Sequence, residues 1–161
     1  LMIATRCIRA ADATRSVDWQ ILLVIAASIA LGGSLESTGA ASVIADQIVG
    51  LAAGSPMATL IAIFVVTTLF SAVISNLAAA VIVFPIALAA SQQLEVSMLP
   101  FAVTLMMAAS ASFATPIGYQ TNLMVYGPGD YRFSDFFKIG VPLTVLVGVT
   151  TILIVPLVWP F

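Results

Sequence analysis

Long stretches without any charged side chain constrain this chain more than any other feature. No Asp, Glu, Lys or Arg occurs between Asp46 and Glu95, a run of 48 residues, and further runs separate Asp18 from Glu36 and Glu95 from Asp130. Only 7% of the residues are charged and 61% are hydrophobic, whereas soluble domains carry roughly 25% charged residues. Because a soluble surface needs charge, most of this chain must face lipid. The sequence therefore predicts helices that cross a membrane, each needing about 20 apolar residues.

The residue types that are rare or missing exclude several functions. The chain has no His, which removes imidazole metal sites and His general bases. Cys7 is the single cysteine, so neither an internal disulfide nor a redox motif can form. The net charge of −2 includes no basic patch, so we expect no nucleic acid partner. We expect a protein that is not an enzyme and that has no resident cofactor.

The first two predicted segments differ in character. Residues 18–35 form an apolar transmembrane helix, with Trp19 near its start as an interfacial anchor. Residues 36–54 alternate polar and apolar side chains at helical spacing, which predicts an amphipathic helix lying at the membrane interface. We interpret Glu36 and Asp46 as the wet face of that helix.

Residues 56–92 consist of two short apolar arms around a polar centre. Each arm has about 15 residues, or about 22 Å of helix, which is less than the ~30 Å hydrocarbon core. Ser71, Ser75 and Asn76 interrupt the apolar sequence between the arms. This pattern favours a re-entrant helical hairpin with its tip near 75–77. Two ordinary spans with a tight polar turn, or one bent helix, are the alternatives.

The next segment, residues 97–127, is predicted to be a transmembrane helix that is broken near 114–122. Pro116 removes a backbone donor and clashes with the preceding turn, and Gly118 permits backbone conformations that other residues avoid. Exposed carbonyls and amides inside a membrane are tolerated only where they are buried in protein or line a cavity. A plain kink at these two residues is the alternative.

The basic residues predict an orientation in the cell membrane. We expect residues 1–17 to be a cytoplasmic linker that follows an earlier span, residues 128–138 a cytoplasmic loop, and residues 139–161 the terminal transmembrane helix. With this topology, the carboxy terminus lies outside the cell. All basic residues then fall on the cytoplasmic side, as the positive-inside rule requires: Arg6, Arg9, Arg15, Arg132 and Lys138.

The two polar islands are the candidate site. One surrounds Asn76 and the other extends from Thr115 to Asn122, and each coincides with a predicted helix break. Helix amino termini suit anions, whereas unwound carbonyls suit Na⁺, and transporters combine both near the midplane. Neither break contains an ionisable side chain other than tyrosine, which favours Na⁺ coordination by neutral oxygens over a proton relay. Helix packing by small residues and an interhelical hydrogen bond from Asn76 are the alternatives.

At these residues the sequence resembles a known family, the divalent-anion:sodium symporters of the ion-transporter superfamily. The chain resembles the second half of such a transporter. Within the family, it resembles the sulfate-permease-like branch. It is carried by Trp19 to Gly39 (WQILLVIAASIALGGSLESTG), Phe70 to Pro85 (FSAVISNLAAAVIVFP) and Ala114 to Tyr131 (ATPIGYQTNLMVYGPGDY).

The resemblance implies an all-α integral membrane fold. The chain would form one inverted repeat with an amphipathic arm helix, a re-entrant helical hairpin and a discontinuous helix, and it would move by an elevator mechanism in a homodimer. Its Na⁺ site would use Ser71, Ile74, Asn76, Ala114 and Pro116. Its substrate site would use Ser75, Asn76, Leu77, Thr115 and Gly118. We add the polar residues Thr121 and Asn122 of the second island to that substrate site.

Leu77 departs from the family pattern, and Ile117 and Gly118 stand where the dicarboxylate carriers of the family have Pro-Asn. Leu77 stands where the resemblance predicts Thr, so one hydroxyl ligand is missing and a smaller inorganic anion is favoured over a dicarboxylate. We expect a secondary transporter of a divalent anion, sulfate-like or dicarboxylate, with Na⁺ as coupling ion, and with lipid and an amino-terminal half as further partners. A proton-coupled or metalloid permease of the same superfamily, or a non-transporting membrane scaffold, are the alternatives.

Overall fold

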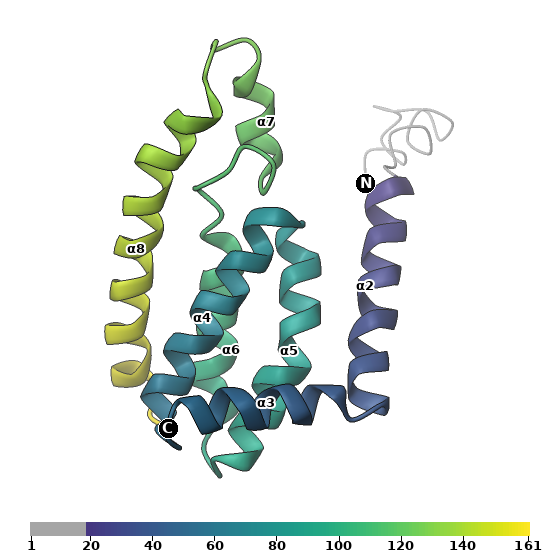
Figure 1. Ribbon diagram of the computed structural model, residues 1–161, viewed down its shortest axis with the longest axis vertical. Coiled ribbons are helices and arrows are strands. Elements are labelled where there is room, and N and C mark those ends of the chain that lie inside the picture. Colours follow the sequence, from purple (N-terminus) through teal and green to yellow (C-terminus); the bar gives the residue numbers. More distant parts are fainter. Residues whose placement is uncertain (1–18) are drawn as a thin grey trace, which may run out of the picture.

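Helices account for the regular structure of the part of the chain that can be described. The computed structural model describes residues 19–161, which form seven helices, α2 to α8, and no strand (Figure 1). The all-α fold that the sequence predicts is therefore confirmed for these residues. The segment 1–17, with Cys7 and the three arginines used to orient the chain, lies outside the described residues.

The first two described helices run in different directions. Helix α2 (Trp19–Ser37) runs to one end of the molecule, where α3 (Ala40–Leu51) lies across that end (Figure 1). Gly39 makes the corner between them with a φ of 74°, a left-handed conformation that suits glycine. Ala41, Ala45 and Val49 repeat every four residues and form the buried face of α3, which packs on α5.

Helices α4 (Pro56–Val73) and α5 (Asn76–Gln93) form a hairpin. Serine side chains begin both arms, because Ser55 Oγ accepts from Ala58 N at 3.4 Å and Ser75 Oγ accepts from Ala78 N at 3.3 Å. Extended backbone at Ile74 and Ser75 joins them. Each arm has 18 residues, longer than the arms of about 15 residues expected from the polar interruptions, because Ser71 and Gln92 remain helical.

The next helix is discontinuous. Helix α6 (Met98–Ser110) is followed by nonhelical residues 111–119 and then by the short helix α7 (Gln120–Tyr126). The break therefore begins before the predicted 114 and ends before Gln120, so Thr121 and Asn122 are helical. The early start has a physical reason: the ring of Pro116 conflicts with a helical carbonyl four residues earlier, at Ser112.

The last helix is longer than the sequence indicates. Helix α8 (Phe133–Val158) begins inside residues 128–138, which the sequence assigned to a loop. The Asp135 carboxylate accepts from Arg132 N at 2.9 Å and so caps the first turn. The polar, aromatic sequence favours a loop because a cap formed by Asp three residues after Arg is a weak sequence signal.

The core lies between α4, α5 and α6. Leu60, Ile63, Val83 and Phe101 are almost wholly buried there. Within a membrane, such side chains stabilise helix association by close packing rather than by leaving water. Helix α8 packs along α6 and α4. The hairpin and the discontinuous helix are thus one packed unit, which fixes the two breaks relative to each other.

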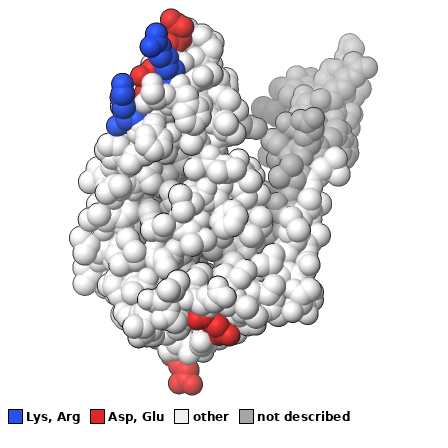
Figure 2. Space-filling model, viewed as in Figure 1, with Lys and Arg blue, Asp and Glu red and all other residues white. Residues whose placement is uncertain are grey.

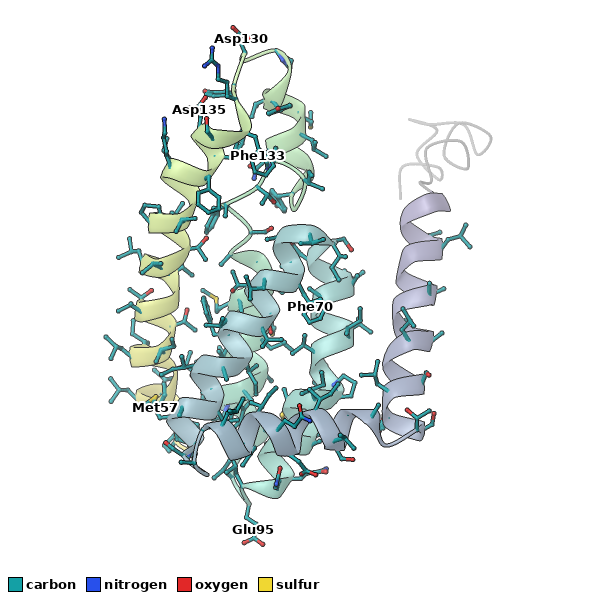
Figure 3. The ribbon with its side chains drawn as sticks, viewed as in Figure 1. Met57, Phe70, Glu95, Asp130, Phe133 and Asp135 are labelled. Carbon is teal, nitrogen blue, oxygen red and sulfur yellow. The ribbon has the colours of Figure 1, made fainter. Side chains whose placement is uncertain are left out.

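The lengths of the apolar helices and the positions of the charged side chains identify the part of the molecule that faces the membrane. Within residues 19–161, α4, α5 and α8 are each long and apolar enough to cross a membrane. Among the described residues on the face drawn in Figure 2, charged side chains lie at the two ends of the molecule. Glu95 lies at one end and Asp130 and Asp135 at the other (Figure 3). The middle, where the two breaks meet, is uncharged.

A candidate ion and anion site

The discontinuous helix is fastened to the end of the hairpin's first arm. Ser112 Oγ donates to the Ser71 carbonyl at 2.9 Å, and Thr115 Oγ1 donates to the Ala72 carbonyl at 2.8 Å. The last carbonyls of a helix have no partner within the helix. The hydroxyls of the break supply those partners, so the two polar islands predicted separately from the sequence lie in direct contact.

Four polar groups converge where the breaks touch. Ser71 Oγ lies 2.6 Å from the Ala109 carbonyl oxygen and 2.8 Å from one terminal atom of the Asn76 amide. The same amide atom lies 3.0 Å from the Gly118 carbonyl oxygen and 3.1 Å from that of Ala109. We call these four residues, Ser71, Asn76, Ala109 and Gly118, the oxygen cluster.

The identity of that amide atom decides how the oxygen cluster is satisfied. If it is the nitrogen, its two hydrogens can serve the three oxygens around it, one hydrogen being shared. If it is the oxygen, it faces two carbonyl oxygens and a hydroxyl, and the single hydroxyl hydrogen can serve only one acceptor. Ser71 is wholly buried and Ala109 is 4% exposed, so water cannot easily relieve the repulsion. The amide nitrogen is therefore the atom that lies inward, where it satisfies the surrounding oxygens.

Gly118 is needed for the close approach of the two breaks. A Cβ atom there would collide with Ser112 Oγ and would lie 2.7 Å from the Ser71 carbonyl oxygen. Gly118 N also donates to Thr115 Oγ1 at 3.2 Å. Any larger residue would push the Gly118 carbonyl away from Asn76.

Two further side chains hold the break from behind. Asn122 Nδ2 donates to the Thr115 carbonyl at 3.1 Å, and Thr144 Oγ1 on α8 donates to the Ala111 carbonyl at 3.1 Å. Helix α8 can come this close because Gly140 has no side chain: a Cβ there would lie 2.7 Å from Ala114 Cα. Helix α8 thereby contributes to the shape of the site.

The remaining predicted residues lie around the oxygen cluster rather than in it. Ser75 caps α5 and is exposed, Leu77 is 45% exposed at the hairpin tip, and Thr121 is exposed on α7. Ile74 and Ala114 are half-buried and Pro116 is buried. Among the hydrogen bonds described for residues 19–161, none brings these last three into the oxygen cluster.

Sequence reasoning missed Thr144 and Gly140 of α8, which lie far from the breaks in sequence, and three contributors nearer to them. Ala109 and Ala72 act through backbone carbonyls, which leave no mark on the sequence. Ser112 was detectable, because it is a hydroxyl in an otherwise apolar run just before Pro116. It was overlooked because the break was expected to begin at residue 114.

The chemistry of the site is that of neutral oxygens. Within the described residues, no group of three or more His, Cys, Asp or Glu side chains gathers to hold a metal ion. Carbonyl, amide and hydroxyl oxygens suit hard cations rather than Zn²⁺ or Cu²⁺. The oxygen cluster has no formal charge, so it matches an ion of low charge.

Comparisons with known proteins place the chain in a family. Residues 1–161 match the family described as citrate transporter. The chain is 38% identical over its whole length to the uncharacterized transporter YfbS of Escherichia coli, of which it spans 27%. Over 98% of its length it is 39% identical to an uncharacterized transporter of Synechocystis, of which it spans 26%.

A further relative is named for its cargo. The chain is 40% identical, over 90% of its length, to sodium/sulfate cotransporter 1 of Chlamydomonas reinhardtii, of which it spans 17%. The chain thus covers about a sixth to a quarter of these relatives, all of which are named as transporters. The chain belongs to the citrate transporter family, as part of a multi-pass membrane protein, and its resemblance to the divalent-anion:sodium symporters is confirmed.

Proposed function

We propose that this chain forms part of a secondary transporter that carries a divalent anion, sulfate-like or dicarboxylate, together with Na⁺. The observation that carries the proposal is the oxygen cluster, in which two helix breaks meet in an uncharged, buried place. The family and the name of the Chlamydomonas relative support both an anion as cargo and sodium as the coupling ion.

The proposed Na⁺ site centres on the oxygen cluster. Ser71 and Asn76 would supply its side-chain ligands, and the Ala109 and Gly118 carbonyls are its backbone ligands. The family resemblance implies three further residues of the Na⁺ site, which would complete the proposed ligand set: Ile74, Ala114 and Pro116. Neutral ligands bind Na⁺ without a proton relay, which distinguishes this proposal from a proton-coupled or metalloid permease.

The proposed anion site lies beside the Na⁺ site, at the start of α5. The first N–H groups of an 18-residue helix have no intrahelical partner and carry partial positive charge. Ser75 and Asn76 sit at that start. The remaining proposed contacts come from the second break and α7: Thr115, Gly118, Thr121 and Asn122. Leu77 presents no hydroxyl there, which favours a small inorganic anion.

The arrangement of helices supports a re-entrant hairpin, and the elevator motion is proposed from the family resemblance. In Figure 1 the connection between α4 and α5 stops short of α7 and of the turn that enters α8. The tip would therefore lie within the membrane, although each arm has 18 residues. We propose that α3 is the arm that joins this moving unit to a scaffold in a homodimer. In the proposed orientation, Arg132 and Lys138 face the cytoplasm.

Uptake by the full transporter that contains this chain tests the proposal. Radiolabelled sulfate uptake into proteoliposomes is measured with an inward Na⁺ gradient, with a proton gradient, and with neither. The proposal predicts uptake that requires the Na⁺ gradient. Uptake driven by protons alone would favour the alternative permease. Inserted, folded protein that takes up neither sulfate nor succinate would point to a scaffold.

A further inference from the structure

A cavity of about 250 Å³ lies behind the second break, between α7 and the first turns of α8. Its walls come from Phe113 of the break, Val125 of α7 and one face of α8. On that face Asp135, Ile139 and Leu143 repeat every four residues, so their side chains line up along the helix. The cavity therefore follows α8 for about 12 Å, at a rise of about 1.5 Å per residue. None of these residues belongs to the oxygen cluster.

The cavity changes from polar to apolar along its length. Its polar end is at Asp135, which lies at a charged end of the molecule (Figure 3). Tyr131 also lines this end, and its ring packs against that of Phe136 with centroids 5.7 Å apart. Tyrosines gather where lipid meets water. The other end, at Leu143, is apolar and lies about two turns further along the spanning helix. A molecule that fits must therefore be amphiphilic, with its tail pointing into the membrane.

Asp135 decides which head group can bind. Among the described residues that line the cavity, it alone is charged. It is half-buried, and the hydrogen bond described for it, from Arg132 N at 2.9 Å, uses its Oδ2 atom. The other carboxylate oxygen is left for a donor on the ligand, and a cationic donor binds a carboxylate most strongly. Arg132 and Lys138 are exposed close to Asp135 in sequence, where they can face a phosphate.

We propose that this cavity binds a phospholipid with a primary-amine head group, a phosphatidylethanolamine. Its ammonium group donates to the free oxygen of Asp135, and its phosphate lies toward Arg132 and Lys138. One acyl chain extends along α8 toward Leu143. Phosphatidylcholine has no N–H group to donate to the carboxylate, and phosphatidylglycerol has no cation to pair with it. The head group therefore distinguishes this lipid from others with the same tails.

A lipid at this place packs against the residues that hold the second break. Asn122, whose Nδ2 donates to the Thr115 carbonyl at 3.1 Å, lines the cavity. Gly140, which lets α8 approach Ala114, lines it as well. The lipid thus fills the space between α7 and α8 and stabilises the break from the α8 side.

Native mass spectrometry of the full transporter measures the binding directly. Detergent-purified protein is titrated with phosphatidylethanolamine, phosphatidylcholine or phosphatidylglycerol, all with the same acyl chains. Asp135→Asn removes the charge but keeps a side-chain oxygen that can accept from Arg132 N, so the first turn of α8 stays capped. Asp130→Asn is the control, because it removes an exposed carboxylate of the same end that does not line the cavity. Leu143→Trp fills the apolar end.

The inference predicts that the unsubstituted protein binds phosphatidylethanolamine about three- to tenfold more tightly than the other two lipids, the effect of one hydrogen bond to a charged group. Asp135→Asn should lose this preference, Asp130→Asn should keep it, and Leu143→Trp should lose the tightly bound lipid. Equal binding of the three lipids, or the same preference in Asp135→Asn and Asp130→Asn, would overturn the inference. A preference for phosphatidylglycerol would overturn the amine head group in favour of an anionic lipid held by Arg132 and Lys138.

Discussion

Gly118→Ala isolates the contact between the two breaks from the rest of the fold. The added Cβ would lie 2.7 Å from the Ser71 carbonyl oxygen, which is backbone and cannot swing aside, and it would also collide with Ser112 Oγ. The Gly118 carbonyl must then move away from Asn76. We therefore expect weaker Na⁺ binding in a protein whose helices are otherwise intact.

The size of the effect follows from the two contacts. Overpacking a tight site costs about 1–3 kcal/mol. Displacing the Ser112 hydroxyl from its 2.9 Å bond to the Ser71 carbonyl adds about 0.5–1.5 kcal/mol. If roughly 2 kcal/mol of this total opposes the ion-bound state, the Na⁺ concentration that half-saturates uptake should rise about 30-fold.

The assay is sulfate uptake by proteoliposomes of the full transporter as a function of Na⁺ concentration. Gly50→Ala is the matched control, because Gly50 is helical and nothing lies within 4 Å of a Cβ placed there. That variant should match the unsubstituted protein. Equal Na⁺ dependence in Gly118→Ala and Gly50→Ala, with both proteins inserted, would refute the close contact between the breaks.

Three further substitutions test other parts of the account. Asn76→Ala should abolish uptake without changing membrane insertion, and normal uptake by that variant would remove Asn76 from the site. Thr144→Val should raise the half-saturating Na⁺ concentration about three- to tenfold, because it removes the 3.1 Å bond to the Ala111 carbonyl, worth about 1 kcal/mol. Thr150→Val is its control, since that exposed hydroxyl bonds only within α8, and equal effects of the two would contradict a role for α8 in the site. Leu77→Thr should lower the succinate concentration that half-inhibits uptake of labelled sulfate by about tenfold or more, because the added hydroxyl can donate to a charged carboxylate. An unchanged half-inhibiting concentration would place Leu77 outside the anion site.

The sequence predicted the elements of this fold where apolar length and helix breakers decide the outcome. Serines and Pro56 bound the hairpin arms. The break between α6 and α7 follows from Pro116. Both signals act locally, so they can be recognised without knowing what packs against them.

The boundaries that the sequence misjudged depend on contacts made elsewhere. Pro116 causes the break, and hydroxyls within it then bond to carbonyls of α4, some forty residues away in sequence, which holds the early start at Ala111. Helix α8 begins at Phe133 because Asp135 caps it. The candidate site was found through Ser71 and Asn76, but the Ala109 carbonyl is a backbone group, and nothing in the residue types announces it.

The most direct test of the central claim is ²²Na⁺ binding by the full transporter with one buried hydroxyl removed. Ser71→Ala and Ser91→Ala make the same chemical change at positions that are 0% and 2% exposed, and both hydroxyls bond to a backbone carbonyl. Only Ser71 belongs to the oxygen cluster. The account predicts that Ser71→Ala weakens Na⁺ binding about tenfold or more, because the ion loses one ligand whose contribution is comparable to a hydrogen bond to a charged group. Ser91→Ala should bind Na⁺ with unchanged affinity. Equal Na⁺ affinity in the two variants would contradict a sodium site at the meeting point of the breaks.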